Sequence, residues 1–507
     1  MQTAIPRHVR LDAADNIAVC IDAAEPGADV AGVTASRRIP RGHKLALRAI
    51  AAGEPVVKFG QIIGFASTAI EPGDHVHEHN CAMGDFARDY QFGAGSGWTP
   101  PCLDGLPATF RGIRRADGRA GTRNFIAVLT SVNCSASVAR FVAREIEQSG
   151  VLDDYPNVDG IVAFTHGTGC GMAASGEGYD LLQRTLWGHA ANPNTGGALM
   201  IGLGCEVFQI PRMMETYRLK DRDTFRTMTI QGSGGTRSTV AQAVEAVKAM
   251  LPAVNDAARE DVPVSQLALA LQCGGSDGYS GITANPALGH AADLLVAAGG
   301  TAMLSETPEI YGAEHLLTRR AVDRETGDKL VARIRWWEDY TARLGGNMNN
   351  NPSPGNKLGG LTTILEKSLG AAAKGGTAPL SGVFEYGEPV DRRGFVFVDT
   401  PGYDPCSVTG QVASGANIVA FTTGRGSAFG YRLAPSLKLA TNSQMYRTME
   451  EDMDIDCGDI LDGVTIEEKG REIFRALVAA ASGDPTKSEQ LGYGDNEFVP
   501  WQIGAIM

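Results

Sequence analysis

Short apolar runs that alternate with helix-like segments constrain this chain more than any other feature. From about residue 110 onward, each run of four or five mostly apolar residues is followed by a stretch with polar loops or helical periodicity. The runs are Phe125–Leu129, Gly160–Phe164, Ala198–Ile201, Leu267–Leu271, Thr301–Leu304, Phe395–Val398 and Ile418–Phe421. The helical candidates are Ser137–Gln148, Ser238–Met250, Gly289–Ala298 and Arg324–Leu344. This alternation is typical of βα units and predicts an α/β fold with mostly parallel sheets.

The first ninety or so residues have a different pattern. Brief β-like runs at Ile17–Cys20, Pro55–Lys58 and Gln61–Ala66 are separated by turn-forming residues. We therefore predict a small β-rich domain at residues 1–90. A linker is expected at 91–109, in the stretch from Ala82 to Pro107 that is rich in Gly, Pro and polar residues. Two α/β domains are expected to follow, at 110–258 and 259–507.

Composition excludes several classes of function. The 507-residue chain has 45 basic and 58 acidic residues and a formal charge of −13, without the basic stripe of a nucleic-acid binder. It has no apolar stretch of the roughly 18–20 residues that a membrane span needs, and Met1–Arg10 lacks the apolar core of a signal peptide. The nine cysteines are scattered. We expect a cytoplasmic protein without nucleic-acid or membrane partners, and the sequence leaves a homo-oligomer open.

Reactive side chains follow the predicted strands. Cys134, Cys170, Cys205 and Cys273 each stand within a few residues of the end of an apolar run. Ligands bind beyond the carboxyl ends of parallel strands, so convergent thiolates there could hold iron or an iron–sulfur cluster with one open position. The spacing matches no compact zinc or ferredoxin motif, and cysteine also packs well where strands end.

A second metal candidate lies in the N-terminal region, at His75-Val76-His77-Glu78-His79. Alternation along a strand would place the three imidazoles on one face, and histidine is a common metal ligand. We therefore keep His75 and His77 as alternative metal ligands. The same pattern also suits a surface cluster or a lid over a substrate.

Two glycine-rich stretches resemble phosphate-binding loops only superficially. Gly202-Leu203-Gly204 lacks the third glycine of a dinucleotide fingerprint, and Gly424-Arg425-Gly426 lacks the lysine of a phosphate loop. Arg425 is better interpreted as a clamp for a carboxylate, which guanidinium binds in bidentate fashion. The turn Asn351–Lys357 could deliver Lys357 to a substrate, although a lysine at such a turn can also be a solvated surface charge.

Several of these segments together resemble the altronate/galactarate dehydratase family over nearly the whole chain. The motifs that carry the resemblance are Cys273–Asp277, Ser280–Pro286, Asn351–Lys357 with Gly359-Gly360, Glu366–Gly370, Phe421–Gly426, Gly202–Glu206 and Gly121–Asn124. The N-terminal region is similar to the SAF-type β domain of this family, through Arg41–Lys44, Lys58–Gly60, Ile63-Gly64 and His75–Asn80. The fold implied is a small SAF-like domain followed by a large catalytic region of βα units.

The resemblance implies a hydro-lyase of sugar-acid catabolism that is stimulated by Fe²⁺, with Mn²⁺ as a substitute. Its substrate would be a hexonate or hexarate and its product a 2-keto-3-deoxy sugar acid. His75–Asn80, Ile282–Pro286, Tyr311–Glu314 and Ala440–Ser443 are more similar to altronate dehydratases, whereas Gln411–Gly415 and Leu317–Val322 are more similar to galactarate dehydratases. We expect altronate first and galactarate second.

Three more distant functions are kept as alternatives. A related branch eliminates sulfite from sulfolactate, but its pattern lacks equivalents of Cys170 and Cys205. An NAD-dependent dehydrogenase is disfavoured by the missing third glycine. A sugar-acid-binding protein without activity is disfavoured by the number of reactive side chains at strand ends.

Dehydration of a sugar acid requires removal of a weakly acidic proton beside a carboxylate and loss of the neighbouring hydroxyl. A base with a suitable pKa removes the proton, and a metal or fixed donors must stabilise the resulting charge. We expect His166, Lys357 and Asp277 to be catalytic, with His166 or Lys357 as the base. The residues expected to bind substrate are Arg425, Arg123, Ser276, Asn285, Asn356 and Thr423.

Overall fold

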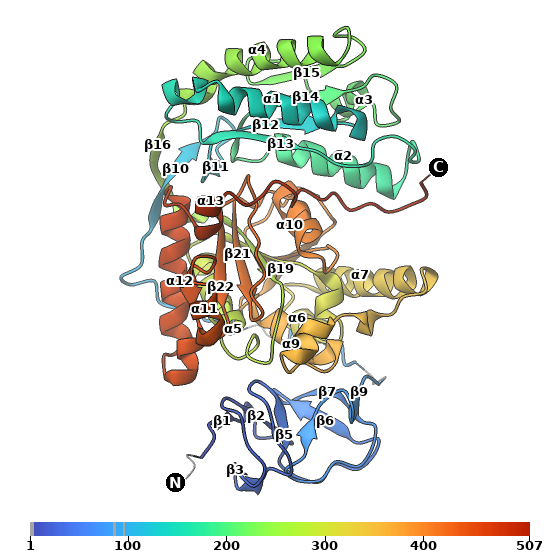
Figure 1. Ribbon diagram of the computed structural model, residues 1–507, viewed down its shortest axis with the longest axis vertical. Helices are drawn as coiled ribbons and strands as arrows, with labels where there is room; N and C mark the ends of the chain where they lie inside the picture. The colour runs from blue at the N-terminus through green and yellow to red at the C-terminus, as the bar shows by residue number, and fades with distance from the viewer. Residues whose placement is uncertain (1–4, 85–87, 95–96, 507) are drawn as a thin grey trace.

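The computed structural model describes residues 5–84, 88–94 and 97–506. They form three tiers along the long axis of the molecule (Figure 1). The N-terminal residues form one end, the segment of about 110–258 forms the other, and the C-terminal half of the chain lies between them. The N-terminal domain therefore packs on the last part of the chain, not on the segment that follows it in sequence. This order brings residues around 40–80 beside residues around 280–370.

The N-terminal tier is built from short antiparallel strands, as the sequence predicts. One sheet has the order β1-β2-β5-β8 and another the order β6-β7-β9, and β3 pairs with β4. The bounds are His8–Val9 (β1), Ile17–Cys20 (β2), Asp29–Val30 (β3), Val33–Thr34 (β4), Lys44–Ala46 (β5), Pro55–Lys58 (β6), Gln61–Ala66 (β7), His75–Val76 (β8) and Cys81–Ala82 (β9). Buried Val19, Ile63 and Val76 pack in one cluster with Leu369 and Ala372. The N-terminal domain thus shares an apolar core with helix α9 (Ile364–Ala373).

The tier at the opposite end contains a parallel sheet with the order β13-β12-β14-β15. Its strands are Phe125–Thr130 (β12), Gly160–Phe164 (β13), Thr195–Gly202 (β14) and Phe225–Thr229 (β15). Helices α1 (Ala136–Gln148) and α4 (Thr236–Asn255) share a core with one face of this sheet. Helix α2 (Glu177–Ala190) packs on the other face and against α10 (Asp404–Ala413) of the middle tier. The short α3 spans Ile210–Thr216.

The middle tier contains a seven-stranded parallel sheet with the order β19-β20-β18-β17-β21-β22-β23. The strands are Ala268–Cys273 (β17), Thr301–Leu304 (β18), Leu380–Phe384 (β19), Gly394–Val398 (β20), Ile418–Thr423 (β21), Ser436–Ala440 (β22) and Ile455–Asp456 (β23). Its helices are Ala284–Ala297 (α5), Glu314–Thr318 (α6), Arg324–Arg343 (α7), Pro354–Leu358 (α8), Ile364–Ala373 (α9), Asp404–Ala413 (α10), Ser443–Thr448 (α11), Ile466–Ala481 (α12) and Lys487–Leu491 (α13). Parallel strands with intervening helices confirm the predicted α/β class.

A small antiparallel sheet links the two α/β tiers. Strand β10 (Thr109–Arg114) pairs with β11 (Ala120–Gly121) and with β16 (Arg259–Pro263), so the chain enters and leaves the outer tier at the same place. Residues 85–87 and 95–96 of the predicted linker stretch lie outside the described residues. Between β9 and β10, the described residues include no helix or strand. Arg88 nevertheless pairs with Glu314 at 2.9 Å, which holds this segment against the middle tier.

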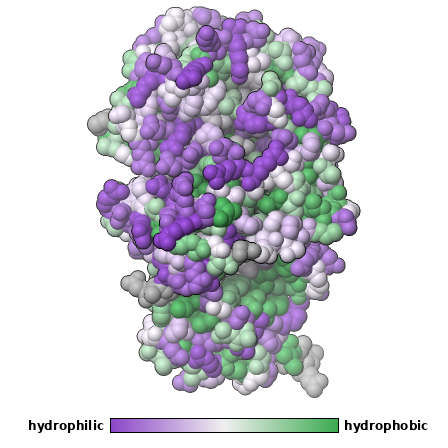
Figure 2. Space-filling view, turned by 180° about the vertical axis from the view of Figure 1, so that it is seen from behind, coloured by the Kyte–Doolittle hydropathy of each residue, from purple (hydrophilic) through white to green (hydrophobic). Residues whose placement is uncertain are grey.

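The face of the molecule drawn in Figure 2 carries both hydrophilic and apolar areas. Seen from behind, polar residues cover much of the two α/β tiers, while apolar residues gather near the level at which the N-terminal domain joins them (Figure 2). In the described part of the chain, no helix combines the length and the apolar character needed to cross a membrane.

Candidate active site

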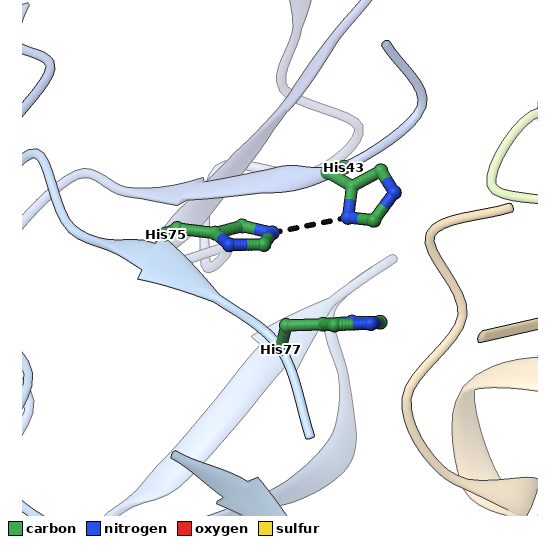
Figure 3. A group of neighbouring side chains, drawn as sticks. All are labelled: His43, His75 and His77. Carbon is green, nitrogen blue, oxygen red and sulfur yellow. Dashed lines mark hydrogen bonds between the residues drawn. The ribbon is translucent and has the colours of Figure 1, made fainter. Parts of the chain in front are cut away.

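Three histidines meet on the face of the N-terminal domain that points toward the middle tier (Figure 3). Strands β5 and β8 are antiparallel, with Leu45 opposite His75 and Lys44 opposite Val76. Continuing this register by one residue places His43 across from His77. One ring nitrogen from each of the three histidines lies within 4.8 Å of the others, and His43 Nδ1 is 3.0 Å from His75 Nε2. The sheet therefore builds a compact set of imidazole nitrogens.

The environment of these rings keeps them neutral. Burial lowers the pKa of His75 to about 3 and that of His77 to about 4, and it also lowers the pKa of His43. Neutral imidazole is the form that binds metal ions. His77 Nδ1 is buried and has no hydrogen-bond partner, which is costly unless something else satisfies it. Neutral rings and an orphaned nitrogen both fit a divalent transition metal.

A buried ion network lies next to the three histidines. Glu366 Oε2 lies 2.8 Å from Lys44 Nζ, and Glu366 Oε1 lies 2.9 Å from Lys58 Nζ. Burial alone would raise the pKa of Glu366, but the two ammonium groups lower it well below its usual range. Lys44 stands next to His43, so this network joins the histidine-bearing face of the N-terminal domain to helix α9. Both lysines come from the N-terminal domain, and the carboxylate comes from the middle tier.

The segment that contains Lys357 covers the histidine cluster. His43 Nε2 is 3.3 Å from the carbonyl oxygen of Leu358, and Lys357 Nζ is 3.0 Å from Glu78 Oε2. Gly360 has a φ of +105°, and a Cβ there would lie 2.3 Å from the carbonyl oxygen of Gly42. Only glycine permits this conformation and this close approach. The helix α8 turn is thereby fixed beside the three histidines.

A cavity of about 340 Å³ adjoins this arrangement. Leu358, whose carbonyl contacts His43, lines the cavity. Arg41, two residues before His43 in the sequence, lines it as well. The other walls come from the carboxyl ends of the adjacent strands β17, β21 and β22. They include Asp277, Tyr279, Arg425 and Asn442. A parallel-sheet edge and the N-terminal domain therefore enclose one site between them, with two guanidinium groups facing it.

Asp277 is held rigidly at the floor of this cavity. Its carboxylate accepts hydrogen bonds from the backbone of Tyr279 and Ser280 and from the side chains of Ser280, Thr441 and Asn442, at 3.0–3.1 Å. Burial raises the pKa of Asp277 in spite of these donors. Asn356 completes the capping box of α8 with Ser353 and donates to the Ser276 carbonyl at 2.8 Å. Ser276, Asp277 and Asn356 are thus neighbours in the structure.

A second cluster of possible metal ligands lies deeper in the middle tier, at Cys273, Glu306 and Glu309. Two ammonium groups already occupy its surroundings. Lys374 Nζ is 2.8 Å from Cys273 Sγ and 2.6 Å from Glu306, and Lys367 Nζ is 2.7 Å from Glu309. Burial raises the pKa of the Cys273 thiol well above its usual range. A neutral thiol and paired carboxylates suit a metal ion less well than the three histidines do.

Asp404 beside this cluster provides a pH prediction. Burial, together with the charge of Glu309, raises the pKa of Asp404 from 3.8 to about 7. The unfolded chain releases this proton near pH 3.8, but the folded chain keeps it, so this group destabilises the fold progressively as pH rises from about 4 to about 7. Between pH 4 and pH 7, we expect the unfolding free energy of the wild type to fall by at least about 1 kcal/mol more than that of Asp404→Asn. Denaturant titrations at several pH values measure this, and equal slopes would contradict the assignment.

Other residues predicted for the site lie elsewhere. Arg123 precedes β12 and therefore lies at the amino-terminal ends of the strands in the outer tier. Its guanidinium is buried against Glu489 at 2.7–2.8 Å. His166 follows β13 in the outer tier, where its Nε2 is 2.8 Å from the Thr130 carbonyl and burial lowers its pKa to about 4. The structure gives both residues local structural contacts and separates them from the cavity that Asp277 and Arg425 line.

The remaining predicted residues divide into two groups. Asn285 and Thr423 lie near the carboxyl ends of the strands in the middle sheet, but their side chains make hydrogen bonds within the protein. Asn285 donates to the Gly370 carbonyl and accepts from Thr422. Thr423 accepts from the backbone of Gly426 and Ser427. The four cysteines are split between two sheets. Cys134, Cys170 and Cys205 follow β12, β13 and β14, whereas Cys273 ends β17. Cys273 therefore ends a strand that does not neighbour the other three, and the four cysteines do not share one sheet edge.

Sequence reasoning missed His43 as a third partner of His75 and His77. The segment Arg41-Gly42-His43-Lys44, which contains it, contributed only to the family resemblance. The distance of 32 residues between His43 and His75 hides their proximity, and only the pairing of β5 with β8 reveals it. The signal that could have found His43 is its place just before a strand that would pair with the His-x-His strand.

Comparison with known proteins covers nearly the whole chain. The family model described as Altronate/galactarate dehydratase SAF domain matches residues 6–84. The model for D-galactarate dehydratase/Altronate hydrolase, second domain, matches 112–255, and the model for D-galactarate/Altronate dehydratase, C-terminal, matches 264–506.

Three curated relatives are similar over most of their length. The chain is 36% identical to an altronate dehydratase of Bacillus subtilis (strain 168) over 463 residues, which cover 89% of each protein. It is 36% identical to a galactarate dehydratase (L-threo-forming) of Escherichia coli (strain K12) over 476 residues, 91% of this chain and 90% of the relative. It is 33% identical to an altronate dehydratase of the same organism over 494 residues, 96% of this chain and 97% of the relative.

Proposed function

This chain belongs to the altronate/galactarate dehydratase family, and from that premise we propose that it removes water from a hexonate, altronate first, at the cavity between its N-terminal domain and its seven-stranded sheet. Its relatives support hydro-lyase activity. The observation that carries the placement of the site is the set of three neutral imidazoles beside a cavity lined by Arg41 and Arg425. Metal ligands and carboxylate-binding groups are both needed for this chemistry.

We propose Fe²⁺ as the metal, with Mn²⁺ as a substitute, and His43, His75 and His77 as the residues that would hold it. When bound, such an ion supplies positive charge that stabilises the anion formed beside the carboxylate and assists the departure of hydroxide. Three neutral nitrogen ligands would leave its full charge available for this role.

The protein groups have separate tasks in this proposal. Arg425 is exposed to the cavity and pairs with no carboxylate in the described part of the chain, so it is free to bind the carboxylate of a substrate. Asn442 also lines the cavity, and its amide donates to the Asp277 carboxylate at 3.1 Å and so holds that group in place. Of the three predicted catalytic residues, His166 lies in the other tier and Asp277 is saturated with donors. Lys357 therefore remains as the base, and it would take the proton beside the carboxylate as a neutral amine, after it has given its own proton to solvent.

Galactarate is the second candidate substrate because two guanidinium groups line the cavity. Arg41 and Arg425 come from different tiers, and a hexarate has a carboxylate at each end. Ion pairing at both ends would be available only to a hexarate. Arg41 already donates to the Ile21 carbonyl at 3.1 Å, so its hold on a second carboxylate is partial and galactarate stays the second candidate.

A panel of hexonates and hexarates tests the proposed function. Protein loaded with Fe²⁺ under reducing conditions is expected to form a 2-keto-3-deoxy acid from altronate, galactarate or both. The product is measured chemically, with metal content determined on the same sample. Absence of product from every panel member, although the metal is bound, would refute the proposal. A change in nicotinamide absorbance with product formation would favour a dehydrogenase instead.

Substitution of Arg425 by lysine is expected to raise KM by about 10- to 100-fold. Lysine keeps the charge but cannot grip a carboxylate in bidentate fashion, and a hydrogen bond to a charged group contributes about 1.5–3 kcal/mol. Metal content should stay unchanged because Arg425 is not a ligand. Arg37→Lys, at an exposed position of the N-terminal domain, is the matched control. An unchanged KM, or a loss of metal in Arg425→Lys, would refute the assigned role.

A further inference from the structure

Three cysteines follow three adjacent parallel strands of the outer tier. Strand β12 lies between β13 and β14, and the cysteines that come after these strands are Cys134, Cys170 and Cys205. Neighbouring strands of a sheet are about 4.8 Å apart, so the loops that leave their carboxyl ends begin close together. All three cysteines are free and exposed. None of them contributes to the cavity between the N-terminal domain and the middle tier.

Hydrogen bonds tie the three loops to one another beside the cysteines. Asn133 N donates to the Thr168 carbonyl at 3.0 Å, and Phe208 N donates to the Gly169 carbonyl at 3.0 Å. The hydroxyl of Ser131 donates to Glu206 at 2.6 Å. Asn133 precedes Cys134, Gly169 precedes Cys170, and Glu206 follows Cys205. Each loop is thus anchored to another within a few residues of its own cysteine.

The approach of two of these loops depends on a glycine. Gly169 has a φ of +96°, and a Cβ at this position would lie 2.1 Å from the Ser131 carbonyl oxygen. Any side chain here would push the loop of Cys170 away from the loop of Cys134. Helix α1 also begins at Ala136, directly after the Cys134 loop. Its N-terminal end carries partial positive charge, which favours an anionic ligand at this edge.

We propose that Cys134, Cys170 and Cys205 form a three-thiolate site for an iron–sulfur cluster, separate from the proposed dehydration site. Thiolates at the edge of a rigid sheet are the ligands that such clusters use. A single tetrahedral ion is less suitable. With metal–sulfur bonds of about 2.3 Å it would need the sulfurs close together, but among the described residues the three sulfurs are not one of the groups with ligand atoms within 4.8 Å. A cluster bonds each sulfur through a different iron and therefore spans a wider triangle.

The fourth position of this cluster would be open to solvent or to a small oxygen ligand. Cys273 cannot fill it, because it ends a strand of another sheet and contacts Lys374 at 2.8 Å. Of the other cysteines, Cys20, Cys81, Cys406 and Cys457 are buried, and Cys102 is exposed between β9 and β10. Three protein ligands with one open iron would give the outer tier a ligand-binding function of its own.

Anaerobic purification and reconstitution with iron and sulfide test this proposal on the full chain. We expect the wild type to bind about four irons and four acid-labile sulfides, with the broad visible absorption of a cluster. Cys134→Ser, Cys170→Ser and Cys205→Ser should each lower the labile sulfide at least about tenfold, while the thermal unfolding midpoint changes little because all three positions are exposed. Cys102→Ser is the matched control and should keep the cluster.

The readout separates this proposal from the dehydratase assignment. A His75→Gln/His77→Gln variant should lose activity but keep its labile sulfide and visible spectrum. Absence of labile sulfide from the reconstituted wild type would overturn the proposal. So would an unchanged cluster in the triple Cys→Ser variant, or binding of metal at these thiols without sulfide.

Discussion

Replacement of His77 by alanine is expected to remove the metal from the N-terminal domain and to lower kcat by at least about 10²- to 10³-fold. A bound metal contributes several kcal/mol to the stabilisation of charge in the transition state, and each 1.4 kcal/mol corresponds to a factor of ten in rate. His77 is one of three imidazoles in the set and has a buried Nδ1 without a partner. Elemental analysis and steady-state kinetics on the same preparation measure both effects.

His79→Ala is the matched control for this experiment. His79 belongs to the same sequence motif and its ring lies 5.5 Å from that of His75, but it is exposed and stands outside the set of three. We expect metal content near that of the wild type and only a small change in kcat. If His77→Ala retained both metal and activity, the three histidines would not be the metal site.

Replacement of Glu366 by alanine is expected to destabilise the protein by about 3–5 kcal/mol. The substitution leaves the ammonium groups of Lys44 and Lys58 buried without their counter-ion, and an unpaired buried charge costs several kcal/mol. All three side chains are at most 2% exposed. Denaturant-induced unfolding, followed by a probe in the N-terminal domain, measures the loss.

Glu260→Ala is the control for Glu366→Ala. Glu260 pairs with Arg114 across β10 and β16, but both side chains are about half exposed, so the pair should contribute no more than about 1 kcal/mol. A loss of less than about 1 kcal/mol in Glu366→Ala would show that the network does not hold the two tiers together.

The strands that the sequence predicts are the ones with unbroken apolar cores. Gly160–Phe164 and Thr301–Leu304 match β13 and β18, and the predicted helix Arg324–Leu344 ends one residue beyond α7. Strands buried on both faces contain continuous apolar runs, so their sequences identify them without tertiary information.

Elements with buried polar groups escaped the same reasoning. Strand β22 contains Lys438 at its centre, although all five of its residues are buried. Helix α10 is also largely buried, yet it carries Ser407, Thr409 and Gln411, whose side chains make hydrogen bonds with neighbouring elements. These partners come from distant parts of the sequence, and a local apolar pattern cannot report them.

The candidate site shows the same division. Asp277, Asn356, Lys357 and Arg425 were predicted from loops that follow strands or from an ordered turn, and the structure places them around the cavity or beside it. His43 and the Lys44–Glu366–Lys58 network were not predicted, because they depend on strand pairing and on the contact between the N-terminal domain and α9. Long-range pairing of this kind has no local signature in a single sequence.

Reaction in deuterated water tests the central claim most directly. Removal of the proton beside the carboxylate and loss of the adjacent hydroxyl produce an enol, which takes a solvent proton at carbon 3 when it becomes the keto acid. With Fe²⁺-loaded protein and altronate, we predict a 2-keto-3-deoxy product that carries one carbon-bound deuterium at carbon 3, detected by NMR and mass spectrometry on freshly formed product. A product without deuterium at that carbon, or an oxidised sugar acid that retains all its oxygen atoms, would contradict dehydration by this chain.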